Sequence, residues 1–157
     1  MTRSLAVEQS RLIRVGVDDA FAGTLPLPLT TIFSRWYGPI PPIKDVRDQT
    51  GDWATPGQTR VLVMTGGGSM REELTSVDPP HSFGYTLTGI TGPLALLVDR
   101  AEGKWVFTAS GTATTVTWRW IIHARSALST PLLPVLGRVW KGYARRSLET
   151  LSALLTG

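Results

Sequence analysis

The fold is decided by TPLLPVLGRVWKGYARRSLETLSALL, residues 130–155. Thr130 can cap a helix that begins at Pro131, where a missing N–H is tolerated. Apolar residues recur along the stretch at three- and four-residue steps: Leu132, Leu136, Val139, Trp140, Tyr143, Leu148, Leu151 and Leu155. The pattern predicts one amphipathic helix over about residues 131–155. At 1.5 Å per residue it would be roughly 37 Å long, enough to cross a sheet.

Upstream of this helix, the apolar residues follow the shorter period of β-strands. The expected strands cover residues 4–17, 43–48, 58–65, 69–77, 81–90, 100–108 and 114–123. Two short helices are expected after the first strand, one capped by Asp18 and Asp19 and one within 29–37. This order predicts an α+β fold in which an antiparallel sheet of about seven strands packs against the long C-terminal helix.

The composition fits one globular domain spanning residues 1–157. Apolar residues make up 42% of the chain and charged residues 18%. The absence of cysteine excludes disulfides and thiolate chemistry. The net charge is +4, but the basic residues are scattered, which argues against nucleic acid as a partner. No secretory leader and no apolar run of about 18 residues is present, so we expect a cytoplasmic protein without stable membrane insertion.

Five segments carry a family resemblance through their order. They are FSRWYG at 33–38, MREEL at 70–74, DPP at 78–80, FGY at 83–85 and VTWRW at 116–120. In this order they resemble the START-like, or polyketide cyclase/dehydrase (SRPBCC), superfamily over nearly the whole chain. The resemblance implies a helix-grip fold, with the sheet wrapped around the C-terminal helix. It also implies a cavity for lipids, polyketides or isoprenoids, with cyclase or dehydratase activity in some members.

No self-sufficient catalytic or cofactor motif stands out in the sequence. His81 and His123 lack a second ligand at a metal-binding spacing. The glycine-rich stretch 66–69 lacks the Gly-Lys-Ser/Thr ending of a phosphate loop and is better explained as a hairpin turn. No serine lies in a Gly-x-Ser-x-Gly elbow. We therefore expect neither a metal site nor a cofactor.

One carboxylate is a candidate for chemistry. If Met70 and Leu74 face the core, strand alternation places Glu72 there as well. A carboxylate inside an apolar cavity has a raised pKa and can act as an acid, a base or a ligand anchor. The alternative is a Glu72 at an edge or on the surface, paired with Arg71 or with a basic residue on a neighbouring strand.

Strand alternation also groups the aromatic side chains. Trp118 and Trp120 share one face of the last strand, and Trp105 and Phe107 share one face of the strand before it. The expected ligand-binding residues are Trp36, Glu72, Tyr85, Trp105, Phe107, Trp118, Trp120, Trp140 and Tyr143. The alternative is that the tryptophans only fill the space under the helix, as large apolar side chains commonly do.

Three functions fit these observations. The leading hypothesis is binding of a hydrophobic small molecule between the sheet and the C-terminal helix. A cyclase or dehydratase that uses Glu72 to move protons on a bound β-keto chain is the first alternative. The second is a protein- or membrane-docking module that uses the basic helix face of Arg138, Lys141 and Arg145. The sequence makes no prediction of oligomeric state.

Overall fold

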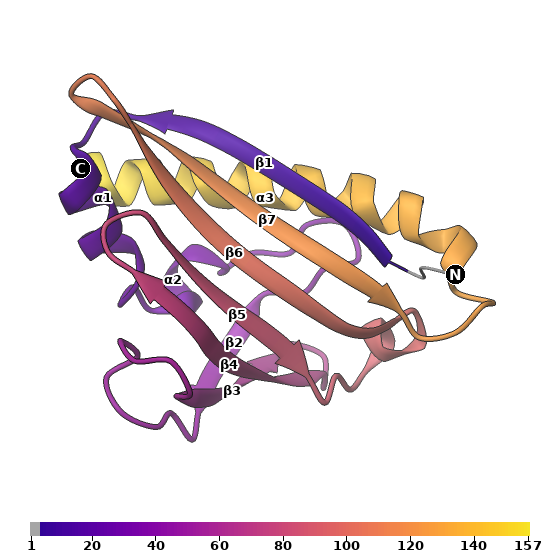
Figure 1. The fold of residues 1–157 in the computed structure, drawn as a ribbon. Helices are drawn as coiled ribbons and strands as arrows, with labels where there is room; N and C mark the ends of the chain where they lie inside the picture. Colours follow the sequence, from indigo (N-terminus) through magenta and orange to yellow (C-terminus); the bar gives the residue numbers. More distant parts are fainter. Residues whose placement is uncertain (1–3) are drawn as a thin grey trace.

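The computed structural model describes residues 4–157, which form one seven-stranded antiparallel sheet crossed by a long helix (Figure 1). The strands are β1 (Ser4–Ile13), β2 (Ile43–Arg47), β3 (Thr59–Met64), β4 (Ser69–Asp78), β5 (Ser82–Thr88), β6 (Val98–Ser110) and β7 (Ala113–Ala124). Their order across the sheet is β1-β7-β6-β5-β4-β3-β2. Strands β2 to β7 therefore form a meander, and β1 pairs with β7. The predicted α+β class and helix-grip arrangement are confirmed.

The helical segments lie between β1 and β2, before β6, and at the C-terminal end. They are α1 (Val17–Thr24), α2 (Leu29–Ile32), the 3-10 turns η1 (Pro93–Leu96) and η2 (Thr130–Leu132), and α3 (Leu133–Thr156). The close approach of α3 to β1 depends on Gly137. A Cβ at Gly137 would lie 2.8 Å from Leu5 Cδ2 and 3.2 Å from Val7 Cγ1. Packing against the sheet thus explains this glycine in the helix interior.

The start of the C-terminal helix differs from the prediction. Thr130 does not cap α3, because residues 130–132 first form the 3-10 turn η2 and α3 begins at Leu133. The Thr130 hydroxyl instead donates a hydrogen bond to the Ser126 carbonyl at 3.1 Å. Ser129 also donates to this carbonyl, at 3.0 Å. Both hydroxyl groups therefore stabilise the turn that precedes the helix.

The two short helices also differ in detail. Asp18 and Asp19 lie in the first turn of α1, where they favour the helix dipole, and the N-cap residue is Gly16. The predicted second helix over 29–37 ends at Ile32. The Phe33 N–H closes its single turn, and the Phe33 carbonyl accepts a hydrogen bond from Ile43 at the start of β2. This link to the sheet ends the helix early.

The alternation predicted for β7 is confirmed. Val116, Trp118 and Ile122 are at most 2% exposed, whereas Arg119 faces solvent on the other side of the sheet. The inner faces of the strands and the inner side of α3 form one apolar core. The candidate site lies within this core.

Candidate ligand cavity

A cavity of about 380 Å3 lies among the inner face of the sheet, α2 and α3. Its lining is mostly apolar, with a few polar side chains on the strands: Arg60, Glu72 and Tyr85, together with hydroxyls of the surrounding loops. Apolar cavities with a small number of converging polar groups are typical of small-molecule sites. The chemistry of this cavity therefore depends on how those few polar groups are arranged.

Eight of the nine predicted ligand-binding residues border the cavity: Trp36, Glu72, Tyr85, Trp105, Trp118, Trp120, Trp140 and Tyr143. Trp36 is 54% exposed, which places it at the rim. Phe107 is the exception. Its ring packs against Phe21 and against the lining residue Phe83, at centroid distances of 5.4 and 6.0 Å, so it lies behind the lining and does not border the cavity. Phe107 does share the inner face of β6 with Trp105, as predicted. Helix α1 covers that end of the strand, so Phe107 contacts α1 and not the cavity.

Four tryptophans form a continuous aromatic wall. Trp105 and Trp118 stack with ring centroids 5.0 Å apart. Trp140 of α3 lies 5.0 Å from Trp118 and 5.7 Å from Trp120, so it joins the helix to the sheet. Trp140 Nε1 is buried and has no hydrogen-bond partner among the described residues. The wall thus combines a broad apolar surface with one unpaired polar hydrogen.

The Tyr85 hydroxyl is held by two of these indoles. Trp118 Nε1 donates a hydrogen bond to Tyr85 Oη at 2.8 Å, and Trp120 Nε1 donates to the same oxygen at 2.9 Å. Gly103 makes this possible, because a Cβ there would collide with the Tyr85 ring. Burial raises the pKa of Tyr85, so its hydroxyl stays protonated at neutral pH. The phenol is a fixed neutral group of the cavity wall.

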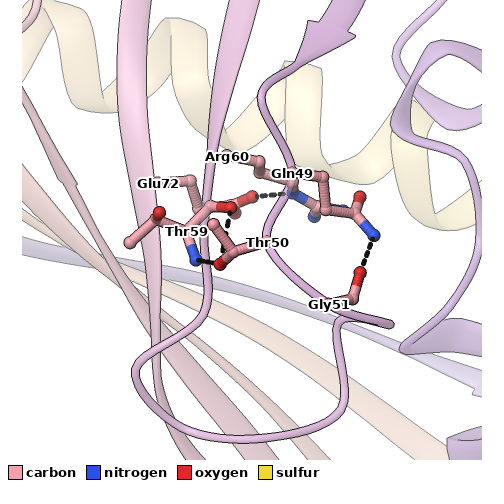
Figure 2. A network of polar contacts seen from close by, with 6 residues as sticks. All are labelled: Gln49, Thr50, Gly51, Thr59, Arg60 and Glu72. Atoms are coloured by element: carbon pink, nitrogen blue, oxygen red, sulfur yellow. Dashed lines mark hydrogen bonds and ion pairs between the residues drawn. The ribbon is translucent and has the colours of Figure 1, made fainter.

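Glu72 borders the cavity. It forms a buried ion pair with Arg60 (Figure 2). Its Oε1 accepts a hydrogen bond from Arg60 Nε at 2.6 Å, and the two residues are 4% and 7% exposed. Burial raises the pKa of the Glu72 carboxyl, and the Arg60 guanidinium works against that rise. The predicted inward parity with Met70 and Leu74 is confirmed. The alternative paired Glu72 with a basic residue of a neighbouring strand only if Glu72 lay at an edge or on the surface. In the structure Glu72 has such a partner, Arg60, and is nevertheless buried.

A loop between β2 and β3 covers the guanidinium. The Arg60 Cζ lies 3.8 Å from the centroid of the Trp53 ring, in cation–π geometry. Thr50 and Thr59 close this loop. The Thr50 N–H donates to the Thr59 carbonyl at 2.8 Å, and the Thr59 N–H donates to Thr50 Oγ1 at 2.8 Å (Figure 2). Arg60 is thus held between a carboxylate and an indole.

Sequence reasoning missed Arg60, Trp53 and Gly103, which position the polar groups of the site. Arg60 had a usable signal, since it shares strand parity with Leu62 and therefore faces inward with it. Trp53 lies in an irregular loop, where no periodicity indicates its direction. The role of Gly103 depends on the ring of a residue on the adjacent strand, which the sequence does not place.

The basic side of α3 is exposed, as predicted. Arg138, Lys141 and Arg145 face solvent, and none forms an ion pair with an acidic residue of the described chain. No helix between residues 4 and 157 is both long and apolar enough to cross a membrane. Over the same residues, no three His, Asp or Glu side chains gather closely enough to hold a metal ion. The docking hypothesis stays a prediction.

Solved structures of low sequence identity share this fold. A point mutant of norcoclaurine synthase from Thalictrum flavum matches with a TM-score of 0.72 and 14% identity, covering 98% of this chain and 94% of that chain. The di-domain ARO/CYC StfQ of the steffimycin biosynthetic pathway gives 0.70 and 16%, covering 98% of this chain and 51% of that one. Major latex-like protein 151 from Panax ginseng gives 0.65 and 13%, with 96% of both chains covered. These similarities show the fold alone.

The sequence itself matches one family model. A search of curated proteins found no match. The model described as polyketide cyclase/dehydrase and lipid transport matches residues 4–156, nearly the whole chain. This chain belongs to the polyketide cyclase/dehydrase and lipid transport family.

Proposed function

We propose that the protein binds an apolar small molecule of lipid, polyketide or isoprenoid type in the cavity between the sheet and α3. The observation that carries this proposal is the cavity of about 380 Å3 with its wall of tryptophans. Burying an apolar ligand against such a wall contributes about 25 cal/mol per Å2 of apolar surface removed from water. The family description, which includes lipid transport, supports the same conclusion.

A matched pair of tryptophan substitutions tests the proposal. Leu62 borders the cavity and is 4% exposed, whereas Leu96 lies outside the lining and is 77% exposed. Leu62→Trp fills part of the cavity, and Leu96→Trp makes the same chemical change on the surface. The readout is titration with the neutral fluorescent probe N-phenylnaphthylamine, after circular dichroism has shown that both variants are folded.

The wild-type protein and Leu96→Trp should bind the probe, and Leu62→Trp should bind it more weakly. Equal binding by all three proteins, or no binding to the wild type, contradicts the proposal. Native mass spectrometry of the purified protein adds an independent measurement, because an apolar molecule that co-purifies would reveal its chemical class by its mass.

The position of Glu72 favours a second candidate function, a cyclase or dehydratase. Glu72 borders the cavity, which supports a role for its carboxylate in moving a proton on a bound β-keto chain. Glu72→Gln keeps the size of the side chain and removes the base. For an enzyme, this variant should still bind a β-keto thioester and lose its turnover. Absence of turnover in the wild-type protein leaves binding as the function.

A further inference from the structure

We propose that the cavity contains a hydrogen-bond-donating subsite at Tyr85, so that the bound molecule is an apolar compound carrying an acceptor oxygen such as that of a carbonyl group. This inference rests on the proposed binding function and adds the polar group that the ligand must carry. Its basis is the pair of indole N–H groups that hold the Tyr85 oxygen, together with the position of this residue on the cavity wall.

The hydrogen-bonding capacity of the Tyr85 hydroxyl is the first step. An indole N–H is a donor only, so both Trp118 and Trp120 donate to the Tyr85 oxygen. These two bonds occupy the acceptor capacity of the hydroxyl. Its proton is the one part left to make a further bond, and no acceptor for it is found between residues 4 and 157. A hydrogen-bond acceptor on a bound ligand would therefore satisfy the Tyr85 hydroxyl proton.

The two indoles also determine which ligands are rejected. An oxygen that already accepts two hydrogen bonds has no place for a ligand O–H or N–H, so the subsite discriminates against donors. Hydrogen bonds in a chain polarise one another, which strengthens the Tyr85 O–H as a donor. Burial keeps the phenol protonated by raising its pKa. Tyr85 therefore acts as a donor at neutral pH, not as a base.

Three other polar groups belong to the residues that line the cavity. Trp140 Nε1 is a second buried donor without a partner among residues 4–157. Glu72 is an acceptor, and its Oε1 oxygen is engaged by Arg60. Tyr143 also borders the cavity, but no indole fixes its hydroxyl, which can rotate to donate or accept. Among these residues, Tyr85 is the one whose hydroxyl two indole N–H groups hold in place as a donor.

Gly103 shows that the position of Tyr85 is built into the sheet. Tyr85 pairs in register with Gly103, and Gly103 pairs with Trp120 on the next strand. The Tyr85 ring lies over the glycine, where any side chain would collide with it. The hydroxyl thus reaches across one strand to the indoles of the next. This arrangement fixes the donor before a ligand arrives, which lowers the entropic cost of binding.

The test compares 9-fluorenone with fluorene, two rigid tricyclic probes that differ by one carbonyl oxygen. Affinities of both are measured for the wild type, for Tyr85→Phe, and for Tyr37→Phe as the same change outside the cavity lining. Relative to the wild type, Tyr85→Phe should lower the fluorenone-to-fluorene affinity ratio about 3- to 10-fold, the effect of one neutral hydrogen bond. Tyr37→Phe should leave the ratio unchanged.

The infrared carbonyl stretch of bound fluorenone gives a second measurement that needs no variant. In the wild-type cavity its frequency should lie below that in cyclohexane, because the carbonyl oxygen accepts a hydrogen bond that weakens the C=O bond. An unshifted stretch, or a ratio that Tyr85→Phe does not change, overturns the inference and leaves the proposed function standing. If neither probe binds the wild type, the proposed function fails and this inference fails with it.

Discussion

The buried pair of Arg60 and Glu72 predicts a large loss of stability when only one partner is removed. Glu72→Ala leaves the Arg60 guanidinium, 7% exposed, without its counter-charge inside the protein. Breaking a buried pair in this way costs about 3–5 kcal/mol. For a chain of this length, 1 kcal/mol corresponds to about 2–4 °C in Tm, so Tm should fall by about 6 to 20 °C.

Two further variants separate the charge effect from the loss of packing. The double variant Arg60→Met with Glu72→Leu removes both charges and keeps apolar bulk, so it should recover most of the lost stability. Glu73→Ala is the matched control on the outer face of the same strand. The Glu73 side chain is 42% exposed and its Oε1 lies 3.9 Å from Arg71 Nη1, so removal of Glu73 should cost less than about 1 kcal/mol.

The measurement is urea unfolding followed by tryptophan fluorescence and circular dichroism, with the free energy of unfolding obtained by linear extrapolation. Two outcomes would refute the reasoning. One is a Glu72→Ala variant no less stable than Glu73→Ala, which would mean that Glu72 is solvated. The other is a double variant as unstable as Glu72→Ala alone, which would mean that packing, not the unpaired charge, is lost.

Three other predictions concern the aromatic side of the cavity. Gly103→Ala should displace the Tyr85 ring, lowering Tm and reducing the fluorenone-to-fluorene ratio as Tyr85→Phe does; an unchanged ratio would contradict the role of this glycine. Phe107→Ala should cost about 3–5 kcal/mol in urea unfolding yet leave fluorene affinity unchanged, because Phe107 lies outside the lining; weakened binding would place it in the site. Fluorenone affinity should stay constant up to about pH 10, where an unperturbed phenol is half ionised, because burial raises the pKa of Tyr85; a fall in affinity below that pH would show an exposed hydroxyl.

Much of the fold could be predicted from periodicity. The three- and four-residue spacing of apolar residues located α3, because burial on one face repeats along a helix. Short apolar stretches bounded by turn residues located all seven strands. The ends of elements were less predictable. Thr130 is predicted to cap a helix, but its hydroxyl donates a hydrogen bond to the Ser126 carbonyl in the preceding turn. A threonine hydroxyl can form either of these local hydrogen bonds, and the residue type alone does not decide between them.

The candidate site was predictable only as far as single strands allow. Parity placed Glu72, Trp105 and Trp118 on the inner face correctly, since each decision needs only one strand. Predicting which residues lie opposite one another on adjacent strands requires the register of the pairing. Arg60 lies directly opposite Glu72 because β3 and β4 pair at that offset. A shift of one residue would turn either side chain to the outer face.

Register also explains why the donor subsite forms where it does. Leu74, Tyr85, Gly103, Trp120 and Val7 form one row across five strands, each paired in register with the next. In such a row, neighbouring side chains stand about 5 Å apart and normally contact only the adjacent strand. Glycine at the middle of the row removes one side chain, so the phenol can lie across the gap and meet the indole two strands away. The glycine in this row therefore lets the Trp120 indole hold the Tyr85 hydroxyl in place as a hydrogen-bond donor. An alanine at position 103 would be enough to separate the two side chains.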